Sequence, residues 1–399
     1  MPGRIFDGLK VIDCASYIAG PAAATVMSDF GAEVIKIEPP GAGDPYRSAL
    51  LRPAGKGMHP NWMMDARNKK SLAIDLASDA GRAVLYRLVA GADVFVTNYP
   101  PPVRRKLRIG VEHLAPLNQR LIYASFTGYG ESGPEADKPG FDSTVWWGRS
   151  GMMDLVRAGP DAIPARSLPG MGDHPSAMAM YGAIVTALYQ REKTGKGGFV
   201  GSSLLANGLW ANSCSVQAQL CGDAVTVQPP RHLAAGPTRN NYRCRDGRWI
   251  ILTVVPTEDR WRKFATHVGD GALLSDPRFG TAADRDANAS AMIAELDRIF
   301  ASKDFADWTR ILEANGLVFG YVARIDDVPN DRQAIASGAL VPFEDDDLLT
   351  VSSPFWVEGQ EKVRPRHAPS VGQHNEQVLR EAGYAAEEIA ALRTAGVIG

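Results

Sequence analysis

Short apolar segments alternate with helical segments through the first third of this 399-residue chain. Runs rich in Val and Ile, typical of buried strands, precede stretches whose apolar residues recur at helical spacing. This alternation predicts an α/β domain in which a Rossmann-like parallel sheet carries helices on both faces. The expected strands are 9–13, 34–37, 72–76, 94–96 and 121–124, and the expected helices are 21–30 and 79–90.

A polar, proline-rich stretch at about residues 221–237 breaks the alternation, and we expect it to link two domains. Beyond it the pattern indicates a smaller α+β unit, followed by a return of the chain near its C-terminus. The expected elements are strands at 249–254 and 319–323, helices at 259–267, 286–300 and 305–315, and a return made of 351–355 and a helix near 375–383.

The composition excludes several classes of protein. A formal net charge of −2 gives no attraction to nucleic acid or to an anionic membrane surface. No apolar run is long enough to span a bilayer, and the first residues lack the apolar core of a signal peptide. The four cysteines form no CxxC pair, and the seven histidines are scattered, so no metal site is expected. We therefore predict a cytoplasmic protein without nucleic-acid, membrane or metal partners.

Nucleotide cofactors are excluded by the loops. The turn after the first strand, at residues 16–21, reads SYIAGP and lacks the glycine spacing of a dinucleotide-binding turn. No phosphate-binding loop of the GxxxxGK[ST] type occurs, and the TGKGG run at 194–198 follows a helix instead of opening one. NAD and ATP are therefore not expected as cofactors.

Asp173 occupies a distinctive position in the chain. Gly170 and Gly172 permit a tight turn before it, and Pro175 suits the first turn of a helix. The helix that follows has one apolar face and ends at Gly195. An aspartate at a helix start is usually a cap that accepts free backbone N–H groups, so a catalytic role needs a further argument.

The segment 168–198 supplies that argument, because it resembles the block that carries the nucleophilic aspartate of family III CoA-transferases. That block has a small-residue turn, Gly-Asp, a helix ending in Ala-Leu and a T-G-K-G exit, and the same residues stand here at 172–173, 187–188 and 194–197. The likeness extends over nearly the whole chain. It implies that Asp173 is catalytic. It also implies a large domain from 1–220 completed by 330–399, a small domain at 225–325, and an interlocked homodimer with its active site between two protomers.

The resemblance also implies that coenzyme A or acyl-CoA binds as a substrate, with no permanently bound cofactor. From the residues alone, the turn at 16–21 is equally consistent with a plain strand-to-helix turn. The cations at 104–108 are by themselves more typical of a solvated helix face. Pro100 and Glu38 stand where many members have a basic residue. The residues implied to contact CoA are Ile18, Ala19, Ile74, Asp75, Leu76, Asn98, Tyr99, Arg105, Lys106 and Lys138.

Phe141 separates two activities within the resembled superfamily. Its racemases carry a histidine at this position, before the residue matching Asp142, and use it to move a proton at the substrate α-carbon. Phenylalanine moves no proton, so the transferase reaction is favoured. For His174, beside Asp173, a solvent-facing position is favoured over a general base. The Gly-Asp-His triplet and the pair Trp146 and Trp147 resemble members acting on 2-hydroxy or aryl acids.

We therefore predict a CoA-transferase that moves CoA from an acyl-CoA donor to a carboxylic acid. The resemblance implies mixed anhydrides and an aspartyl-CoA thioester at Asp173. Some members shield this intermediate with a Gly-rich loop, but the matching residues 234–240 are not Gly-rich, so a different shield is expected. Two alternatives stay open: an acyl-CoA racemase or epimerase, and a non-catalytic CoA-binding protein in which Asp173 is only a cap.

Overall fold

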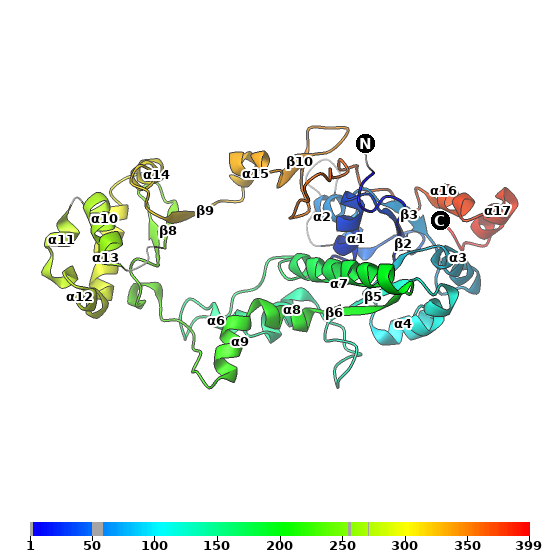
Figure 1. Cartoon of the computed structure of the whole chain (residues 1–399), viewed down its shortest axis with the longest axis horizontal. Coiled ribbons are helices and arrows are strands. Elements are labelled where there is room, and N and C mark those ends of the chain that lie inside the picture. Colours follow the sequence, from blue (N-terminus) through cyan, green and yellow to red (C-terminus); the bar gives the residue numbers. More distant parts are fainter. Residues whose placement is uncertain (1–2, 50–58, 254–256, 270) are drawn as a thin grey trace. The chain divides into compact units, whose positions relative to one another are not determined.

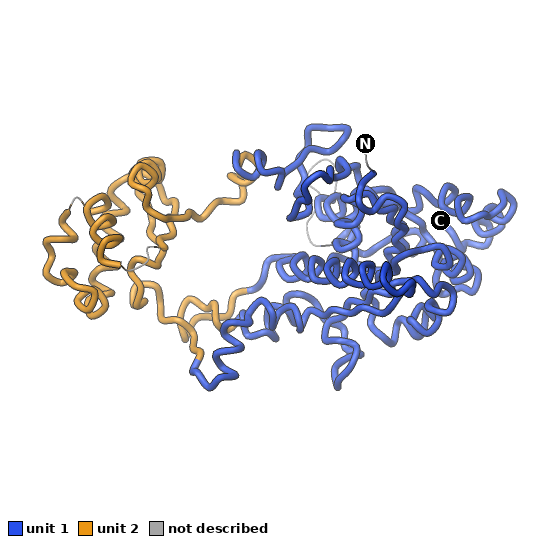
Figure 2. Tube along the Cα trace, in the orientation of Figure 1, with its two compact units in different colours: residues 1–153, 166–224, 332–399 blue, residues 154–165, 225–331 orange. Residues whose placement is uncertain are grey.

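The computed structural model describes residues 3–49, 59–253, 257–269 and 271–399. The chain forms two compact units, shown in blue and orange in Figure 2. The first contains residues 1–153, 166–224 and 332–399, and the second contains residues 154–165 and 225–331. The grouping of 154–165 with the second unit was not indicated by the sequence.

A six-stranded sheet forms the centre of the first unit (Figure 1). All of its pairings are parallel, and the strand order 3-2-1-4-5-6 is that of a Rossmann-type sheet. The predicted parallel α/β architecture is thus confirmed. The strands are β1 (Lys10–Asp13), β2 (Glu33–Glu38), β3 (Lys70–Ala73), β4 (Val94–Thr97), β5 (Ile122–Thr127) and β6 (Gly198–Ser203).

Each strand sends alternate side chains to opposite faces of the sheet, because successive residues of a strand point in opposite directions. In β1, Val11 belongs to the buried cluster under α1 and α7, whereas Ile12 belongs to the cluster on the other face. α1 is buried along its whole length and packs against α7. Its many small residues permit this close approach.

The helices of the first unit follow the predicted pattern, with short additions. Asp173–Thr194, the predicted helix, forms α7 and ends at Gly195 in the left-handed conformation (φ 71°). The others are α1 (Ala19–Asp29), α2 (Pro60–Asp65), α3 (Asp79–Ala90), α4 (Pro101–Leu107), α5 (Val111–Leu114), α6 (Met152–Leu155, at the boundary of the units), α8 (Leu204–Ala211), α9 (Ser213–Leu220), α15 (Arg332–Ala336), α16 (Asn375–Glu381) and α17 (Ala386–Thr394).

The C-terminal segment joins the β3 side of the sheet. The Asn375 side chain accepts a hydrogen bond from the Ala73 backbone (2.8 Å) and donates one to the Gly399 carbonyl (2.7 Å). Ile74 and Ile398 form an isolated antiparallel bridge. A small hairpin of β10 (Leu340–Pro342) and β11 (Leu349–Val351) precedes this segment.

The second unit is a small α+β body built on the antiparallel sheet β7 (Asn241–Arg243), β8 (Trp249–Leu252) and β9 (Phe319–Val322). The strand predicted at 249–254 ends at Leu252, and residue 254 lies outside the described residues. The helix predicted at 286–300 is two helices that meet at Asn288. The helices are α10 (Glu258–Val268), α11 (Ala272–Ser275), α12 (Ala282–Ala287), α13 (Ala289–Phe300) and α14 (Phe305–Ala314).

The glycines after α7 have a steric role. Gly197 passes so close to the residue before β5 that a Cβ atom there would lie 2.1 Å from the Leu121 carbonyl oxygen. Gly198, the next residue, has open space around its Cβ position. Only glycine therefore lets the chain enter β6 from α7 along this path.

We predict that Gly197→Ala destabilises the first unit by about 2–3 kcal/mol, because backbone atoms must move to admit the methyl group. Gly198→Ala is the matched control and should change the free energy of unfolding by less than about 1 kcal/mol. Urea unfolding followed by circular dichroism measures both. Equal stability of the two variants would show that the backbones do not approach so closely.

Candidate active site

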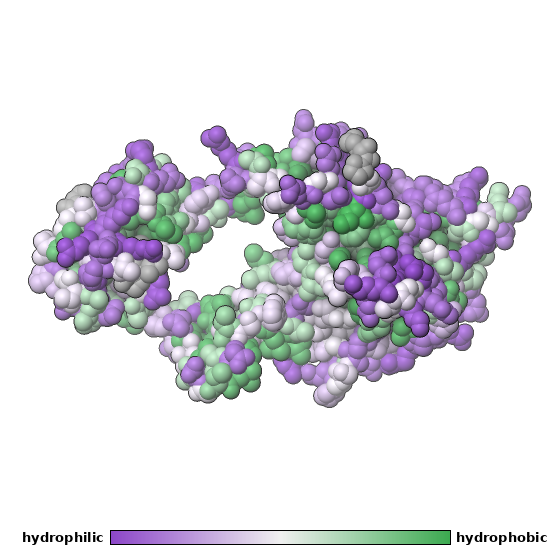
Figure 3. Space-filling model, in the orientation of Figure 1, coloured by the Kyte–Doolittle hydropathy of each residue, from purple (hydrophilic) through white to green (hydrophobic). Residues whose placement is uncertain are grey.

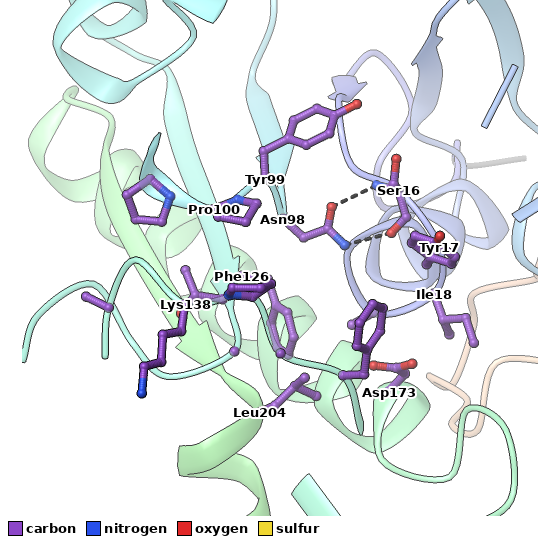
Figure 4. Close-up of a pocket in the computed structure, with 18 of the residues that line it drawn as sticks. Ser16, Tyr17, Ile18, Asn98, Tyr99, Pro100, Phe126, Lys138, Asp173 and Leu204 are labelled. Atoms are coloured by element: carbon purple, nitrogen blue, oxygen red, sulfur yellow. Dashed lines mark hydrogen bonds between the residues drawn. The ribbon is translucent and has the colours of Figure 1, made fainter. Parts of the chain in front are cut away.

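A cavity of about 310 Å³ opens at the carboxyl edge of the parallel sheet (Figure 4). It lies beyond β1 and β4, where the strand order reverses, and such a reversal is the usual ligand site in this architecture. Its lining comes from seven stretches of the first unit, and most of it is apolar. The residues are Ser16, Tyr17, Ile18, Ala19, Pro45, Asn98, Tyr99, Pro100, Pro101, Phe126, Thr127, Gly128, Ala136, Lys138, Pro139, Gly140, Phe141, Asp173 and Leu204.

Asn98 fixes the turn that follows β1. Its side-chain oxygen accepts a hydrogen bond from the Ser16 backbone N–H (2.8 Å), and its side-chain nitrogen donates one to the Ser16 carbonyl (2.6 Å; Figure 4). The next residue, Tyr17, has a φ of 60°, a conformation that L-residues other than Asn and Asp seldom adopt. The turn is therefore held in a defined and mildly strained shape.

Paired charges are buried beneath this turn. The Lys36 ammonium lies 2.7 Å from Asp44 and 3.9 Å from Asp13, and Lys69 lies 2.8 Å from Asp13. Burial lowers the pKa of Lys36, but Asp13 and Asp44 raise it, and the net pKa lies above the ordinary value. Asp44 also accepts a hydrogen bond from the Tyr17 backbone (3.3 Å), which connects these charges to the turn.

Asp173 is the first residue of α7, and Gly172 stands at the cap position without a side-chain hydrogen bond. Within the described ranges, the Asp173 carboxylate accepts no hydrogen bond, so it does not cap the helix. Burial raises the pKa of Asp173 to about 7, and the charges of Asp142 and Asp65 act in the same direction, whereas His174 lowers it. The site thus holds an unpartnered carboxylate with raised basicity.

The His174 side chain is 38% exposed, in line with its expected position at the surface, but its ring also has two partners in the chain. Its Nε2 lies 3.2 Å from Asp65 Oδ1, and its Nδ1 lies 3.1 Å from the Gly170 carbonyl oxygen. Asp65 is buried and accepts a hydrogen bond from the Tyr46 hydroxyl (2.9 Å). No local sequence pattern indicates this pairing, because Asp65 lies 109 positions away at the end of α2.

Aromatic side chains form a wall beside Asp173. Phe141 is 58% exposed and packs edge-to-face on Tyr17, with ring centroids 6.2 Å apart. A π-helical segment, Asp142–Arg149, follows and buries Trp146 against Gly172, where a Cβ atom would lie 2.6 Å from the indole. π-helical turns are uncommon and frequent at functional sites.

The structure brings together part of the predicted CoA-contacting set. Ile18, Ala19, Asn98, Tyr99 and Lys138 line the cavity, and Lys138 lies at its far end from Asp173 (Figure 4). The Lys138 ammonium pairs with Glu135 (2.8 Å).

The other predicted residues lie outside the lining. Ile74 and Leu76 are buried, and Asp75 accepts the Ala77 N–H (2.9 Å). Arg105 is exposed and pairs with Asp137 (3.2 Å), and its neighbour Lys106 is also on α4. The carboxylate of Glu38 is taken up by two hydrogen bonds from Arg47 (2.7 Å each), which accounts for an acidic residue at this position.

Sites of two other kinds are absent from the described residues. No cluster of three His, Cys, Asp or Glu side chains suited to a metal ion occurs among them. None of their helices has the length and apolarity needed to cross a bilayer.

Comparisons with known proteins agree with this architecture. Residues 6–375 match the sequence profile of CoA-transferase family III. The chain is 31% identical to (R)-2-hydroxy-4-methylpentanoate CoA-transferase of Clostridioides difficile (99% of each chain covered) and 30% identical to cinnamoyl-CoA:phenyllactate CoA-transferase of Clostridium sporogenes (98% and 96%). The crystal structure of a CAIB/BAIF family protein from Brucella suis superposes with a TM-score of 0.85 at 27% identity, covering 95% of this chain and 100% of that one.

Fold and site thus define an α/β protein with a cavity at the switch point of its sheet, lined by a carboxylate that has no hydrogen-bond partner among the described residues. The chain belongs to CoA-transferase family III. The similarity to CoA-transferases along nearly the full length supports an enzyme that acts on CoA thioesters.

We predict that Asp173→Asn stabilises the protein at pH 8 by about 2 kcal/mol, with a smaller gain at pH 5. The carboxyl has a pKa of about 7 when folded and an ordinary value of 3.8, so stability is lost as the pH rises between these values. Urea unfolding at both pH values measures this gain. Asp223→Asn, at an exposed carboxylate, is the control, and a gain for Asp173→Asn that does not grow with pH would contradict the prediction.

Proposed function

We propose that the chain is an acyl-CoA:carboxylate CoA-transferase with Asp173 as its nucleophile. The observation that carries the proposal is the Asp173 carboxylate, which faces the cavity without a hydrogen-bond partner among the described residues. A carboxylate retained only for stability would be expected to find donors, because a buried charge without partners is costly. Membership of CoA-transferase family III supports the same nucleophilic role for Asp173.

The reaction conserves the energy of the thioester. A carboxylate oxygen of Asp173 attacks the thioester carbonyl carbon, the C–S bond breaks, and CoA leaves as thiolate, so that a mixed anhydride forms. The thiolate then attacks the aspartyl carbonyl, which releases the donor acid as its carboxylate and forms an aspartyl-CoA thioester. The acceptor carboxylate attacks the carbonyl of this thioester, so that CoA leaves again as thiolate and a second mixed anhydride forms. The thiolate then attacks the acceptor's acyl carbon in this anhydride, and the aspartyl carboxylate leaves. Acyl-CoA product and free Asp173 result.

The local environment suits these steps. A pKa of about 7 leaves a substantial fraction of Asp173 ionised at neutral pH and makes the carboxylate more basic than an ordinary aspartate. Near the start of α7, the His174 and Ser176 N–H groups already donate to the Gly170 and Gly172 carbonyls, so the helix stabilises developing negative charge there through its dipole.

We propose that CoA, bound as a substrate, extends along the turn at residues 16–19, with Lys138 at the end of the cavity farthest from Asp173. There the Lys138 ammonium exchanges Glu135 for a phosphate of the ligand. Ile74, Asp75, Leu76, Arg105 and Lys106 stay predictions as contacts of more distal parts of CoA. No permanent cofactor is proposed.

For the acids, we propose apolar branched or aryl carboxylic acids, including 2-hydroxy acids. Tyr17 and Phe141 present partly exposed rings next to Asp173, and such surface favours apolar acyl groups. The names of two relatives, a 2-hydroxy-4-methylpentanoate transferase and a cinnamoyl-CoA:phenyllactate transferase, agree with this class.

We also propose a homodimer that acts in the cytoplasm. Exposed apolar side chains lie on α7, α8 and α9, and Figure 3 shows apolar surface over α8 and α9. Tyr189, Leu209, Trp210 and Leu220 are 64%, 39%, 82% and 75% exposed, which favours a partner surface. Cys14, Cys214, Cys221 and Cys244 carry free thiols, as is usual in a reducing compartment.

We predict that Asp173→Ala lowers acyl exchange by about 10⁴-fold or more, because the covalent route is lost. Hydroxylamine added with acyl-CoA should inactivate the native enzyme and convert Asp173 to a hydroxamate, detected by peptide mass spectrometry. Asp223→Asn is the control and should keep its acyl-exchange activity and its sensitivity to hydroxylamine. An Asp173→Ala enzyme that exchanges normally would refute the proposal, and CoA binding without exchange over a panel of acids would select the non-catalytic alternative.

We predict that Phe141→Ala raises KM for a branched or aryl acyl-CoA by about tenfold, since apolar contact worth about 1.4 kcal/mol is lost. KM for acetyl-CoA should change little. Trp356→Ala, which removes an exposed ring outside the cavity lining, is the control. A uniform change in KM for all donors would contradict the proposed contact.

Entry of solvent deuterium at the substrate α-carbon would favour the racemase alternative, for which Phe141 provides no base.

A further inference from the structure

The His174 ring faces a hydrogen-bond acceptor at each nitrogen. The Gly170 carbonyl oxygen lies 3.1 Å from Nδ1, and the Asp65 carboxylate oxygen lies 3.2 Å from Nε2. A neutral imidazole has only one N–H, whereas the imidazolium has two. The protonated ring is therefore the form that satisfies both acceptors.

The surroundings are shaped to this ring. Gly170 has a φ of 74°, and a Cβ atom there would lie 3.0 Å from His174 Nδ1 and Cε1, so the loop lies directly against the imidazole. On the other side, Asp65 Oδ2 accepts a hydrogen bond from the buried Tyr46 hydroxyl (2.9 Å). This second hydrogen bond holds the Asp65 side chain in place against the ring.

We propose that His174 is a positioning residue: held as an imidazolium between Asp65 and Gly170, it fixes the start of α7 and places a positive charge beside Asp173. This inference rests on the proposed nucleophilic role of Asp173. Both N–H groups of the ring are committed to other partners, so His174 does not act as a general base.

The charges around the nucleophile explain why such a cation is useful. Asp173 on α7 is faced by Asp142 of the π-helical segment and by Asp65 of α2, and both raise its pKa, whereas His174 lowers it. Burial lowers the pKa of His174, but Asp65, Gly170 and Asp173 raise it, and the net pKa lies above the ordinary value. Without the imidazolium, three carboxylates would share the site, and Asp173 would bind its proton more tightly.

The kinetic test is the pH dependence of Asp173 acylation in the full-length enzyme, with His174→Gln as the variant. The acylation rate rises with pH as Asp173 ionises. Loss of the cation should therefore move this rise in rate to higher pH by about one unit, which slows acylation about tenfold at pH 6. His113→Gln, at a half-buried histidine 3.1 Å from Glu112, is the matched control and should leave the profile unchanged. A purely structural role for His174 would lower the rate equally at every pH, and that result would overturn the proposal.

A second measurement is independent of acyl transfer. NMR of the ¹⁵N-labelled histidine rings should show both His174 nitrogens protonated at pH 7 in the native enzyme, and Asp65→Asn should lower the pH at which one proton is lost. A single-proton tautomer at pH 6.5 would overturn the proposal. If Asp173 is never acylated, the proposed function fails, and the NMR result still decides whether His174 is held as an imidazolium.

Discussion

The cavity depends on charges that are buried under the turn at residues 16–19. Lys36 and Lys69 come from β2 and from the approach to β3, and they meet Asp13 at the end of β1 and Asp44 beyond β2. Any one of these charges would be strongly destabilising in this environment without its partners. The network therefore ties three strands and the turn into one arrangement, and Asn98 connects that arrangement to β4. The edge of the sheet is in this way preorganised before any ligand arrives.

Much of the fold could be predicted from local patterns. The strands and helices of the first third, α7 and its end at Gly195, and the small α+β unit all carry apolar periodicity, glycine stops or capping residues that act over a few positions. β6 escaped prediction because glycines and serines make up most of its sequence, and it becomes a strand only by pairing with β5. The split between α12 and α13 at Asn288 was missed because the apolar spacing continues across it.

The site was less predictable, because its key contacts join distant parts of the chain. Asp173 was predicted as the nucleophile through the resemblance of its whole segment. The five cavity residues of the predicted set lie in the segments that follow β1, β4 and β5, where ligands bind in such sheets. Asp65, Tyr46 and the orientation of His174 had no local signal, since their association requires α2 to pack beside the start of α7. The expectation for His174 therefore covered its partial exposure but not its two partners.

The salt bridge between Lys138 and Glu135 has a consequence for ligand affinity. A phosphate that takes the ammonium must release the carboxylate, so one ion pair replaces another and the net electrostatic gain is small. Binding would then derive mainly from the apolar walls of the cavity and from hydrogen bonds to its backbone. Recognition of this kind is less sensitive to ionic strength than the formal charge of the ligand suggests.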